Sequence, residues 1–390
     1  MEISINMKIL RPLLLISLCI ILSSCSSGKK KKSYRPDRAG RFERVNFSEM
    51  PMWKKDKHLD AFRVFQKSCR KILENGSSCN ISSSTELGSE ARDWFPVCNA
   101  ALKADIDNSM LARVFFERWF TPYRAKNKDK SDNGKFTGYY EISMRGSRHR
   151  TSRYKYPIYR APHNLPKLKG SPELSHSAIN NGSLKGKGLE IAWVDNKARL
   201  FFMQIQGSGV VLLENGGVIK LSYNGENGYS YKAIGPEFRK YKTGKISSAL
   251  DMIEWLHKNP KTAKKIMEQN QSYVFFREVK NGASGPIGAQ SIGLTEHRSI
   301  AVDKYFYPYG TPVWIDTTLP KTRHYPAKRF TRLHIAQDTG GAIRGPVRAD
   351  LFFGRGRKAE QRACYMNQHG TMYALFPKTA DIPTYYKTAH

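Results

Sequence analysis

Residues 334–345 read HIAQDTGGAIRG, and this segment is the most informative in the chain. An apolar, strand-like run ends at Asp338 and is followed by Thr-Gly-Gly, where glycines let the backbone turn sharply and approach a ligand closely. Twelve residues later, Asp350 lies within VRADLFF, residues 347–353. Apolar neighbours desolvate a carboxyl group and raise its pKa, which a general acid near neutral pH requires. In the alternative interpretation Asp338 caps a turn and Asp350 faces water on an edge strand, and the spacing alone favours this alternative.

The rest of the chain alternates between helical and strand-like patterns. Apolar residues recur at helical spacing in residues 59–69, 107–120 and 247–257. Short apolar and aromatic runs broken by Gly, Asn and Pro are typical of β-rich domains. Such runs occupy residues 136–142, 189–194, 200–206, 273–279, 300–302, 311–315, 333–336 and 371–376. This order fits two tandem domains as well as one domain inserted into another. The periodicity of apolar residues does not distinguish these two arrangements.

The composition is that of a packed protein with a large positive charge. The 390 residues are 40% hydrophobic and 12% aromatic, which suits a globular chain with room for two domains. The formal net charge is +32, from 65 basic and 33 acidic residues. Such an excess favours polyanionic partners, so nucleic acid, anionic lipid and acidic cell-wall polymer are all candidates from charge alone.

The N-terminus has the features of a secretory signal peptide. Lys8 and Arg11 precede an apolar run at residues 13–22, which is too short to span a bilayer as a helix. The run ends in LSSC, residues 22–25, which resembles a bacterial lipobox. An ordinary secretory signal that ends near a cysteine is the alternative.

The lipobox resemblance implies that residues 1–24 are removed and that Cys25 carries lipid, at the start of a basic tether over residues 25–45. Ser26 stands where Asp would favour retention in the inner membrane. We therefore expect a lipid anchor in the cell outer membrane, on its periplasmic face. An exported protein does not ordinarily meet nucleic acid, so we expect no nucleic-acid partner, despite the basic and aromatic residues between Arg145 and Lys169.

Four further cysteines remain in the mature chain, namely Cys69, Cys79, Cys98 and Cys364. An oxidising compartment permits disulfides. A Cys69–Cys98 pair, which flanks a compact segment, is the preferred pairing, and four free buried thiols are the alternative. The sequence has neither a CxxC motif nor regularly spaced histidines, so we expect no metal site, and we expect no cofactor.

Several motifs together resemble one known family. Residues 301–303 (AVD), 336–345 (AQDTGGAIRG) and 349–352 (ADLF) resemble the three aspartate motifs of the 3D domain. Further motifs resemble those of the membrane-bound lytic murein transglycosylase A family, namely residues 136–140 (FTGYY), 203–209 (MQIQGSG) and Asn227-Gly228 with Tyr231. These motifs follow the family's order from about Phe136 to Phe376, whereas residues 26–130 match it only loosely.

This resemblance implies a mainly β fold with some α structure. A double-psi β-barrel domain would be built from residues 46–142 and 241–390, with the 3D domain at about 290–378. Residues 143–240 would form a second, inserted β-barrel-like domain, and the chain would have an N-terminal helical part. The groove between the two domains would hold a glycan.

The resemblance also implies roles for single residues. Asp350 would be the catalytic acid and base, Asp338 its partner, and Asp303 a support of the barrel. Amides and hydroxyls suit neutral sugars, because they pair with hydroxyl and acetamido groups without a charge to desolvate. The residues expected to line the glycan groove are Thr137, Gly138, Gln204, Gln206 and Ser208. In the alternative interpretation, these five residues only stabilise turns and do not contact the glycan. Arg344 stands where the family more often has Lys, which keeps the charge.

The implied activity is that of a peptidoglycan lytic exotransglycosylase, a carbon–oxygen lyase, with glycan strands and the outer membrane as partners. One carboxylic acid would protonate the β-1,4 oxygen between N-acetylmuramic acid and N-acetylglucosamine, and would then deprotonate the muramic acid 6-hydroxyl to give the 1,6-anhydro product. Two other hypotheses stay open. Asp338 and Asp350 could together hydrolyse the bond, since hydrolysis normally uses two carboxylates, or the chain could bind peptidoglycan without cutting it.

Overall fold

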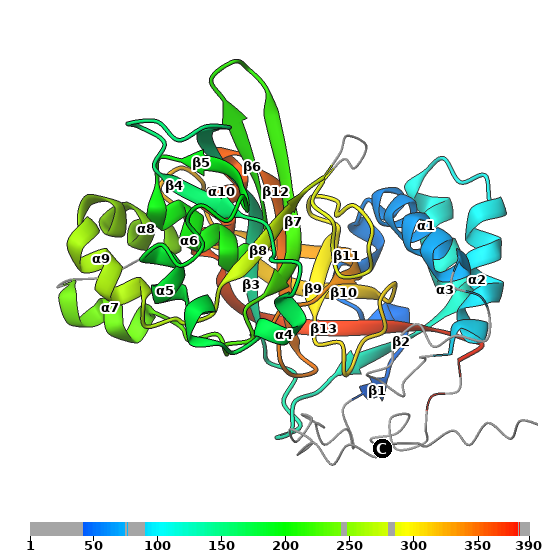
Figure 1. The fold of residues 1–390 in the computed structure, drawn as a ribbon. Helices are drawn as coiled ribbons and strands as arrows, with labels where there is room; N and C mark the ends of the chain where they lie inside the picture. The colour runs from blue at the N-terminus through cyan, green and yellow to red at the C-terminus, as the bar shows by residue number, and fades with distance from the viewer. Residues whose placement is uncertain are drawn as a thin grey trace, which may run out of the picture. The chain divides into compact units, whose positions relative to one another are not determined.

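Strands from distant parts of the chain meet in one mixed sheet in the computed structural model (Figure 1). The structure describes residues 42–74, 76, 90–242, 248–279, 285–380 and 382. The predicted signal peptide, Cys25, most of the predicted tether and Cys79 lie outside these residues. The described strands are β1 (Phe42–Arg44), β2 (Phe120–Ala125), β3 (Gly134–Ser147), β4 (Tyr156–Tyr159), β5 (Glu190–Val194), β6 (Ser208–Leu213), β7 (Val218–Glu226), β8 (Val274–Glu278), β9 (Ser299–Val302), β10 (Pro312–Leu319), β11 (Lys328–Asp338), β12 (Arg348–Arg355) and β13 (Asn367–Pro377).

Six of these strands pair in a closed ring. The order is β13-β10-β11-β9-β12-β3, and β3 pairs back onto the first residues of β13, from Asn367 to Gly370. Two contacts are parallel, β11 with β9 and β12 with β3, and the others are antiparallel. A ring leaves none of these strands with a free edge over the paired residues. The predicted mainly β fold with helices is therefore confirmed, whereas the double-psi connectivity and the domain boundaries stay predictions.

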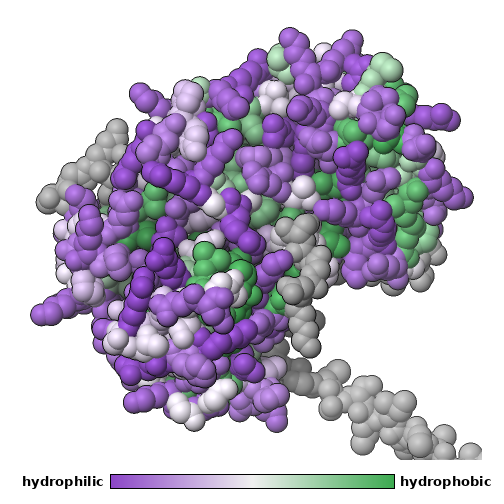
Figure 2. Space-filling model, turned by 90° about the horizontal axis from the view of Figure 1, so that it is seen from above, coloured by the Kyte–Doolittle hydropathy of each residue, from purple (hydrophilic) through white to green (hydrophobic). Residues whose placement is uncertain are grey.

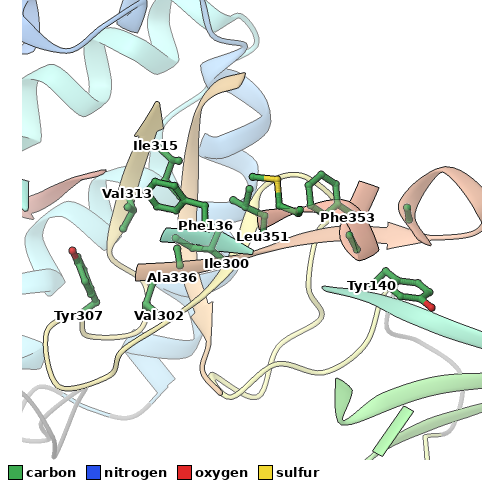
Figure 3. Close-up of a cluster of buried hydrophobic side chains, with 14 of the residues drawn as sticks. Phe136, Tyr140, Ile300, Val302, Tyr307, Val313, Ile315, Ala336, Leu351 and Phe353 are labelled. Carbon is green, nitrogen blue, oxygen red and sulfur yellow. The ribbon is translucent and has the colours of Figure 1, made fainter. Parts of the chain in front are cut away.

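The interior of the ring is filled by apolar side chains that alternate along its strands (Figure 3). Phe136, Ile300, Ala336 and Leu351 come from four different strands and meet in one buried cluster. Because successive side chains of a strand point to opposite faces, the residues between them point out of the ring. The outward positions next to Phe136, Ile300 and Leu351 are Thr137, Ala301 and Asp350.

The expected N-terminal helical part is present, and it covers one outer face of the ring. It consists of α1 (His58–Glu74), α2 (Ala91–Lys103) and α3 (Ser109–Trp119), with the short 3-10 helices η1 (Phe47–Glu49) and η2 (Trp53–Lys55) before them. Their apolar side chains pack on Trp314, Leu333 and Ile335 of the sheet. A disulfide joins Cys69 of α1 to Cys98 of α2, which confirms the predicted pair, and Cys364 is a free thiol.

Two helices differ from the pattern seen in the sequence. Residues 200–206 were expected to be a strand, and this prediction is wrong, because they belong to helix α6 (Lys197–Gln206). Asn196 caps the start of α6 by accepting a hydrogen bond from the Arg199 amide, and Gly207 ends it with a φ of 76°. The helix of residues 107–120 exists as α3, but its apolar residues Met110, Leu111 and Val114 are exposed.

The part of the chain between β3 and β9 mixes strands with short helices. Residues 143–240 contain β4 to β7 and the helical segments α4 (Leu165–Leu168), η3 (Pro172–Leu174), α5 (His176–Asn180), α6 and α7 (Gly235–Tyr241). Further along are α8 (Ala249–Lys258), which confirms the helix expected at 247–257, α9 (Pro260–Met267) and α10 (Arg357–Tyr365). Helices α6 to α9 share a core around Phe201, Phe238 and Ile253.

The surface agrees with the polar composition. Hydrophilic residues cover most of the face seen in Figure 2, and its hydrophobic patches are small and separate. Among the residues that the structure describes, we find no helix that combines the length and the apolar character needed to cross a membrane.

Candidate active site

Two of the predicted catalytic residues lie in one row on the outside of the ring. Asp338 of β11 and Asp350 of β12 each pair with Ala301 of β9, and Asp350 also pairs with Thr137 of β3. Residues paired across a sheet point to the same face. The row therefore runs Asp338, Ala301, Asp350, Thr137. Neighbouring strands are about 4.8 Å apart, so the two aspartate backbones are separated by roughly 10 Å across a single alanine.

A bulge in β11 turns Asp338 toward this row. Ala336 pairs with Ile300, but the next residue of β9, Ala301, pairs with Asp338 rather than with Gln337. A bulge places two residues of one strand opposite one residue of its neighbour and re-aims the side chains. Gln337 is fully buried, and its amide donates to Ser68 Oγ of α1 at 2.8 Å. Without the extra residue, Gln337 would occupy the position beside Ala301 and Asp338 would turn away.

Asp350 is held by one hydrogen bond and has one oxygen free. The Thr137 hydroxyl donates to Asp350 Oδ1 at 2.7 Å, and Arg348 Nη2 in turn donates to the Thr137 oxygen at 2.8 Å. Arg348 thereby directs the Thr137 proton toward the carboxylate. Within the described parts of the chain, Asp350 Oδ2 has no hydrogen-bond partner, so it can meet a substrate atom.

Burial raises the pKa of Asp350, and two neighbours oppose this rise. Loss of water around the carboxyl group is the largest effect, while the Thr137 hydrogen bond and the positive charge of Arg348 lower the pKa. The apolar contacts come from a small buried cluster around the row, formed by Tyr139, Leu294, Ala301, Ile343 and Phe352. A carboxyl group in this setting keeps its proton at higher pH than one in water, as a general acid requires.

Asp338 has a different environment, with both oxygens occupied. Its Oδ1 accepts from the backbone amides of Ala289 at 3.0 Å and Thr339 at 2.9 Å, and its Oδ2 accepts from the Tyr139 hydroxyl at 3.0 Å. Burial raises the pKa of Asp338 to about 6, the three donors lower it, and the charge of Asp350 raises it further. Three donors therefore hold Asp338 in one orientation near Asp350.

Thr137 is the predicted glycan-binding residue that the structure joins directly to Asp350. Gly138 points to the other side of β3, where an added Cβ would lie 2.5 Å from the Phe353 ring, so it is needed for packing. Gln206 accepts from the Tyr140 amide at 3.3 Å and ties α6 to β3. Ser208 is 8% exposed, and Gln204 lines a separate cavity. Glycan contact by these four residues stays a prediction.

Three residues of the site were not assigned a role from the sequence. Tyr139 and Arg348 stand next to predicted residues, and Ala289 contributes only a backbone amide. Tyr139 lies two positions after Thr137, and strand periodicity puts both on the same face, so this signal was present in the sequence. Burial raises the pKa of Tyr139 well above its usual value, which keeps its hydroxyl a donor. Nothing in the sequence around Ala289 indicates that its amide binds Asp338, 49 residues away.

Asp303, the third aspartate of the motifs, is fully buried and holds loops. Its carboxylate accepts from the backbone amides of Tyr305 at 3.1 Å and Gly345 at 2.8 Å. It thus ties the turn after β9 to the glycine-rich segment that precedes β12. Across the described ranges, no three His, Cys, Asp or Glu side chains are grouped so that they could hold a metal ion.

Comparison with known proteins gives two family matches and two curated relatives. Residues 135–277 match the MltA specific insert domain, and residues 298–376 match the 3D domain. The membrane-bound lytic murein transglycosylase A homolog of Buchnera aphidicola subsp. Schizaphis graminum is 33% identical over 260 residues, which is 65% of this chain and 69% of the relative. Membrane-bound lytic murein transglycosylase A of Vibrio cholerae serotype O1 is 31% identical over 254 residues, 63% and 66% of the two chains.

Solved structures resemble the chain over most of its length. A membrane-bound lytic murein transglycosylase from Agrobacterium tumefaciens has a TM-score of 0.76 at 28% identity, covering 87% of this chain and 98% of that one. MltA from Neisseria gonorrhoeae has a TM-score of 0.71 at 29% identity, covering 88% and 96%. E. coli MltA with bound chitohexaose has a TM-score of 0.66 at 25% identity, covering 90% and 98%.

Proposed function

Because the chain belongs to the membrane-bound lytic murein transglycosylase A family, we propose that it is a lytic transglycosylase that cleaves the glycan strands of peptidoglycan. The bond cut is the β-1,4 bond between N-acetylmuramic acid and N-acetylglucosamine, and the product ends in 1,6-anhydromuramic acid. The complex of E. coli MltA with chitohexaose supports a β-1,4-linked sugar chain as the ligand class. Action at strand ends rather than within strands is part of the proposal.

The observation that carries this proposal is the difference between the two carboxyl groups. Burial raises the pKa of both groups, but Asp350 has a single donor and a free oxygen, whereas both oxygens of Asp338 accept from fixed donors. Asp350 therefore offers an unbound oxygen for proton exchange with substrate, whereas three donors hold Asp338 in one orientation. This matches a reaction that uses one carboxyl group twice.

In the proposed reaction, protonated Asp350 gives its proton to the glycosidic oxygen as the bond from the muramic acid C1 to that oxygen breaks. The resulting carboxylate then takes the proton of the 6-hydroxyl of the same sugar, whose oxygen bonds to C1. The leaving N-acetylglucosamine keeps the first proton, and Asp350 is protonated again. The attack is intramolecular, and well-oriented intramolecular reactions reach effective molarities on the order of 10⁵ M or more.

Hydrolysis by two aspartates is less consistent with this geometry. A second carboxylate that activates water needs an oxygen that can accept the proton of that water. The two backbone amides and the Tyr139 hydroxyl lower the basicity of Asp338 and hold it in one orientation, with one acceptor position left on Oδ2. We assign Asp338 the role of holding Tyr139 and the glycine-rich turn in place beside Asp350. Binding without cleavage would not require the raised pKa of Asp350.

The proposed location is the periplasmic face of the outer membrane. The names of both curated relatives describe membrane-bound proteins, which supports association with a membrane. The lipobox at residues 22–25 supplies a route to it, through lipid on Cys25. Stable anchoring needs two lipid signals, or one lipid signal together with a basic segment. The Lys-rich residues 29–32 would supply such a basic segment and strengthen the attachment to the membrane.

The test is mass analysis of the fragments that the purified protein releases from sacculi. Wild-type protein should give anhydromuropeptides, and Asp350→Asn should give almost none, because loss of general acid catalysis alone costs roughly 10²–10⁴-fold. Asn keeps the shape and can still accept from Thr137, so the fold should be unchanged. Reducing-end fragments heavier by one water would show a hydrolase instead, and no soluble fragments at all would leave only binding.

A further inference from the structure

A second cavity lies in the part of the chain between β4 and α6, apart from the aspartate row. Its volume is about 610 Å³, within the range of roughly 300–1,000 Å³ that small-ligand sites occupy. It is lined by β4, β5, α5 and α6, which lie beside one another in Figure 1, together with Met267 and Tyr273. Neither Asp338, Asp350 nor Thr137 lines it. The cavity is therefore not the catalytic site.

Two polar atoms in the wall of this cavity lack partners. Gln204 is 7% exposed, and its side chain hydrogen-bonds to Tyr273, but its Oε1 accepts no hydrogen bond within the described residues. The buried Nδ2 of Asn180, on the opposite helix α5, likewise has no acceptor there. Leaving a buried polar atom without a partner is unfavourable, so a ligand that satisfied both atoms would bind more tightly. The terminal torsions of Gln and Asn are broad, which lets both amides turn toward a bound group.

The rim of the cavity is strongly positive. Arg150, Lys155, Lys185 and Lys197 line it, against the single carboxylate of Glu190. In the described structure none of the four cations forms an ion pair or a side-chain hydrogen bond, although most other arginines nearby, such as Arg148 and Arg199, are paired. Burial lowers the pKa of Lys197, and the negative charge of Glu268 partly opposes this effect, so Lys197 is the least free of the four. The cations are thus available to a ligand.

We propose that this cavity binds the acidic peptide that peptidoglycan strands carry. A peptide group donates through its N–H to Gln204 Oε1 and accepts through its carbonyl from Asn180 Nδ2, and peptide carboxylates meet the four cations of the rim. Tyr156 and Trp193, both partly exposed in the lining, offer apolar surface to the side chains. A phosphate group would satisfy the cations but has no N–H for Gln204. This inference rests on the proposed function only in naming peptidoglycan as the source of the peptide.

Direct binding tests the inference without catalysis. The probe is a synthetic tetrapeptide that contains D-Glu and ends in a free D-Ala carboxylate, titrated into the full chain by calorimetry. We expect binding that weakens with salt, and roughly three- to tenfold weaker binding to a Lys155→Gln, Lys185→Gln double variant. The matched control is Lys54→Gln, Lys55→Gln, which removes two exposed charges from η2 and should bind as wild type. Gln204→Met should weaken binding, because it removes the oxygen that accepts the peptide N–H.

Three results would overturn the inference: no binding of the tetrapeptide, equal binding of the tetrapeptide with both carboxylates amidated, or equal weakening in both double variants. Binding of anionic phospholipid vesicles or of N-acetylglucosamine oligomers at this cavity, without the peptide, would also overturn it.

Cleavage assays separate this inference from the proposed function. The KM for peptide-bearing strands is compared with the KM for strands from which an amidase has removed the peptide. We expect a lower KM for peptide-bearing strands, and the ratio of the two KM values should approach one in the Lys155→Gln, Lys185→Gln variant. Anhydro products from both substrates with equal KM in the wild type would refute the peptide site and leave the transglycosylase standing. Peptide binding with no anhydro product from either substrate would refute the activity and leave the site.

Discussion

Replacing Thr137 by Val should move the pH dependence of catalysis toward higher pH. The Thr137 hydroxyl is the one described donor to Asp350, at 2.7 Å, and it lowers the pKa of that carboxyl group. Val has nearly the same shape and is favoured in strands, so β3 should keep its register beside β12. The substitution removes the donor and leaves Arg348 bound to the carbonyls of Lys135 and Ala349.

The size of the shift follows from the hydrogen bond. A hydrogen bond to a charged group contributes about 1.5–3 kcal/mol, and one pKa unit corresponds to about 1.36 kcal/mol. Because water can enter and replace part of the lost interaction, we expect a rise of about one unit in the pKa of Asp350. Asp350 must be protonated to act as an acid, so activity falls as the pH rises through its pKa. The alkaline limb of kcat/KM should therefore shift upward by about one pH unit.

The assay is the release of anhydromuropeptides from sacculi across the pH range. Thr317→Val is the matched control, because Thr317 also donates at 2.7 Å within the ring, to the carbonyl of His369, and has no contact with Asp350. Its alkaline limb should match that of the wild type. An alkaline limb in Thr137→Val that stays in place, or that moves to lower pH, would refute the assignment of Asp350 as the acid held by Thr137.

Three other changes to the protein test the fold and the anchor. Gly138→Ala should lower the free energy of unfolding in urea by roughly 1–3 kcal/mol, because the new methyl group meets the Phe353 ring at 2.5 Å. The control Gly235→Ala should change this free energy little, because its methyl group meets only an Arg239 nitrogen at 3.6 Å. Equal effects of the two substitutions would contradict the packing argument. Loss of the Cys69–Cys98 disulfide, which spans 29 residues, should cost about 3 kcal/mol in the same measurement, and no change on reduction would rule out a stabilising role. Cys25→Ala protein should be found in the soluble periplasmic fraction and still cut sacculi, whereas recovery with the outer membrane would point to another anchor.

Much of the ring and of the aspartate row could be predicted from the sequence. Strand periodicity found the runs that became β9, β10, β11 and β13, and the family motifs brought Asp338, Asp350 and Thr137 to one site. These features depend on local pattern, or on several motifs that follow one another in order. Residues 200–206 show where such a pattern fails. Their apolar side chains are buried on more than one face of α6, against β3 and β6 and against α8, so helical amphipathicity is hidden. The caps Asn196 and Gly207 were the usable signal.

Other features of the site depend on contacts that no local pattern encodes. The bulge at Gln337 follows from the buried bonds of Gln337 to Ser68 and Ser299, which come from distant segments. The amide of Ala289 reaches Asp338 from a loop that carries no motif. Likewise, the cavity between α5 and α6 brings together Asn180, Gln204 and four cations that are spread over residues 150–204. Only the folded chain shows that these groups share one space.

The position of Asp350 within the ring would let a single carboxyl group serve both steps of the proposed reaction. Strand β12 is bonded on both sides at this residue, to Ala301 of β9 and to Thr137 of β3, so its backbone has no free edge from which to move. Thr137 fixes one carboxylate oxygen, and the other faces outward. The same oxygen can therefore release a proton to the leaving group and receive one from the 6-hydroxyl without a change of rotamer. In a hydrolase the second step needs a water molecule placed by another carboxylate. In the proposed reaction the nucleophile belongs to the bound sugar, so the protein would have to hold only the sugar and one rigid acid in register.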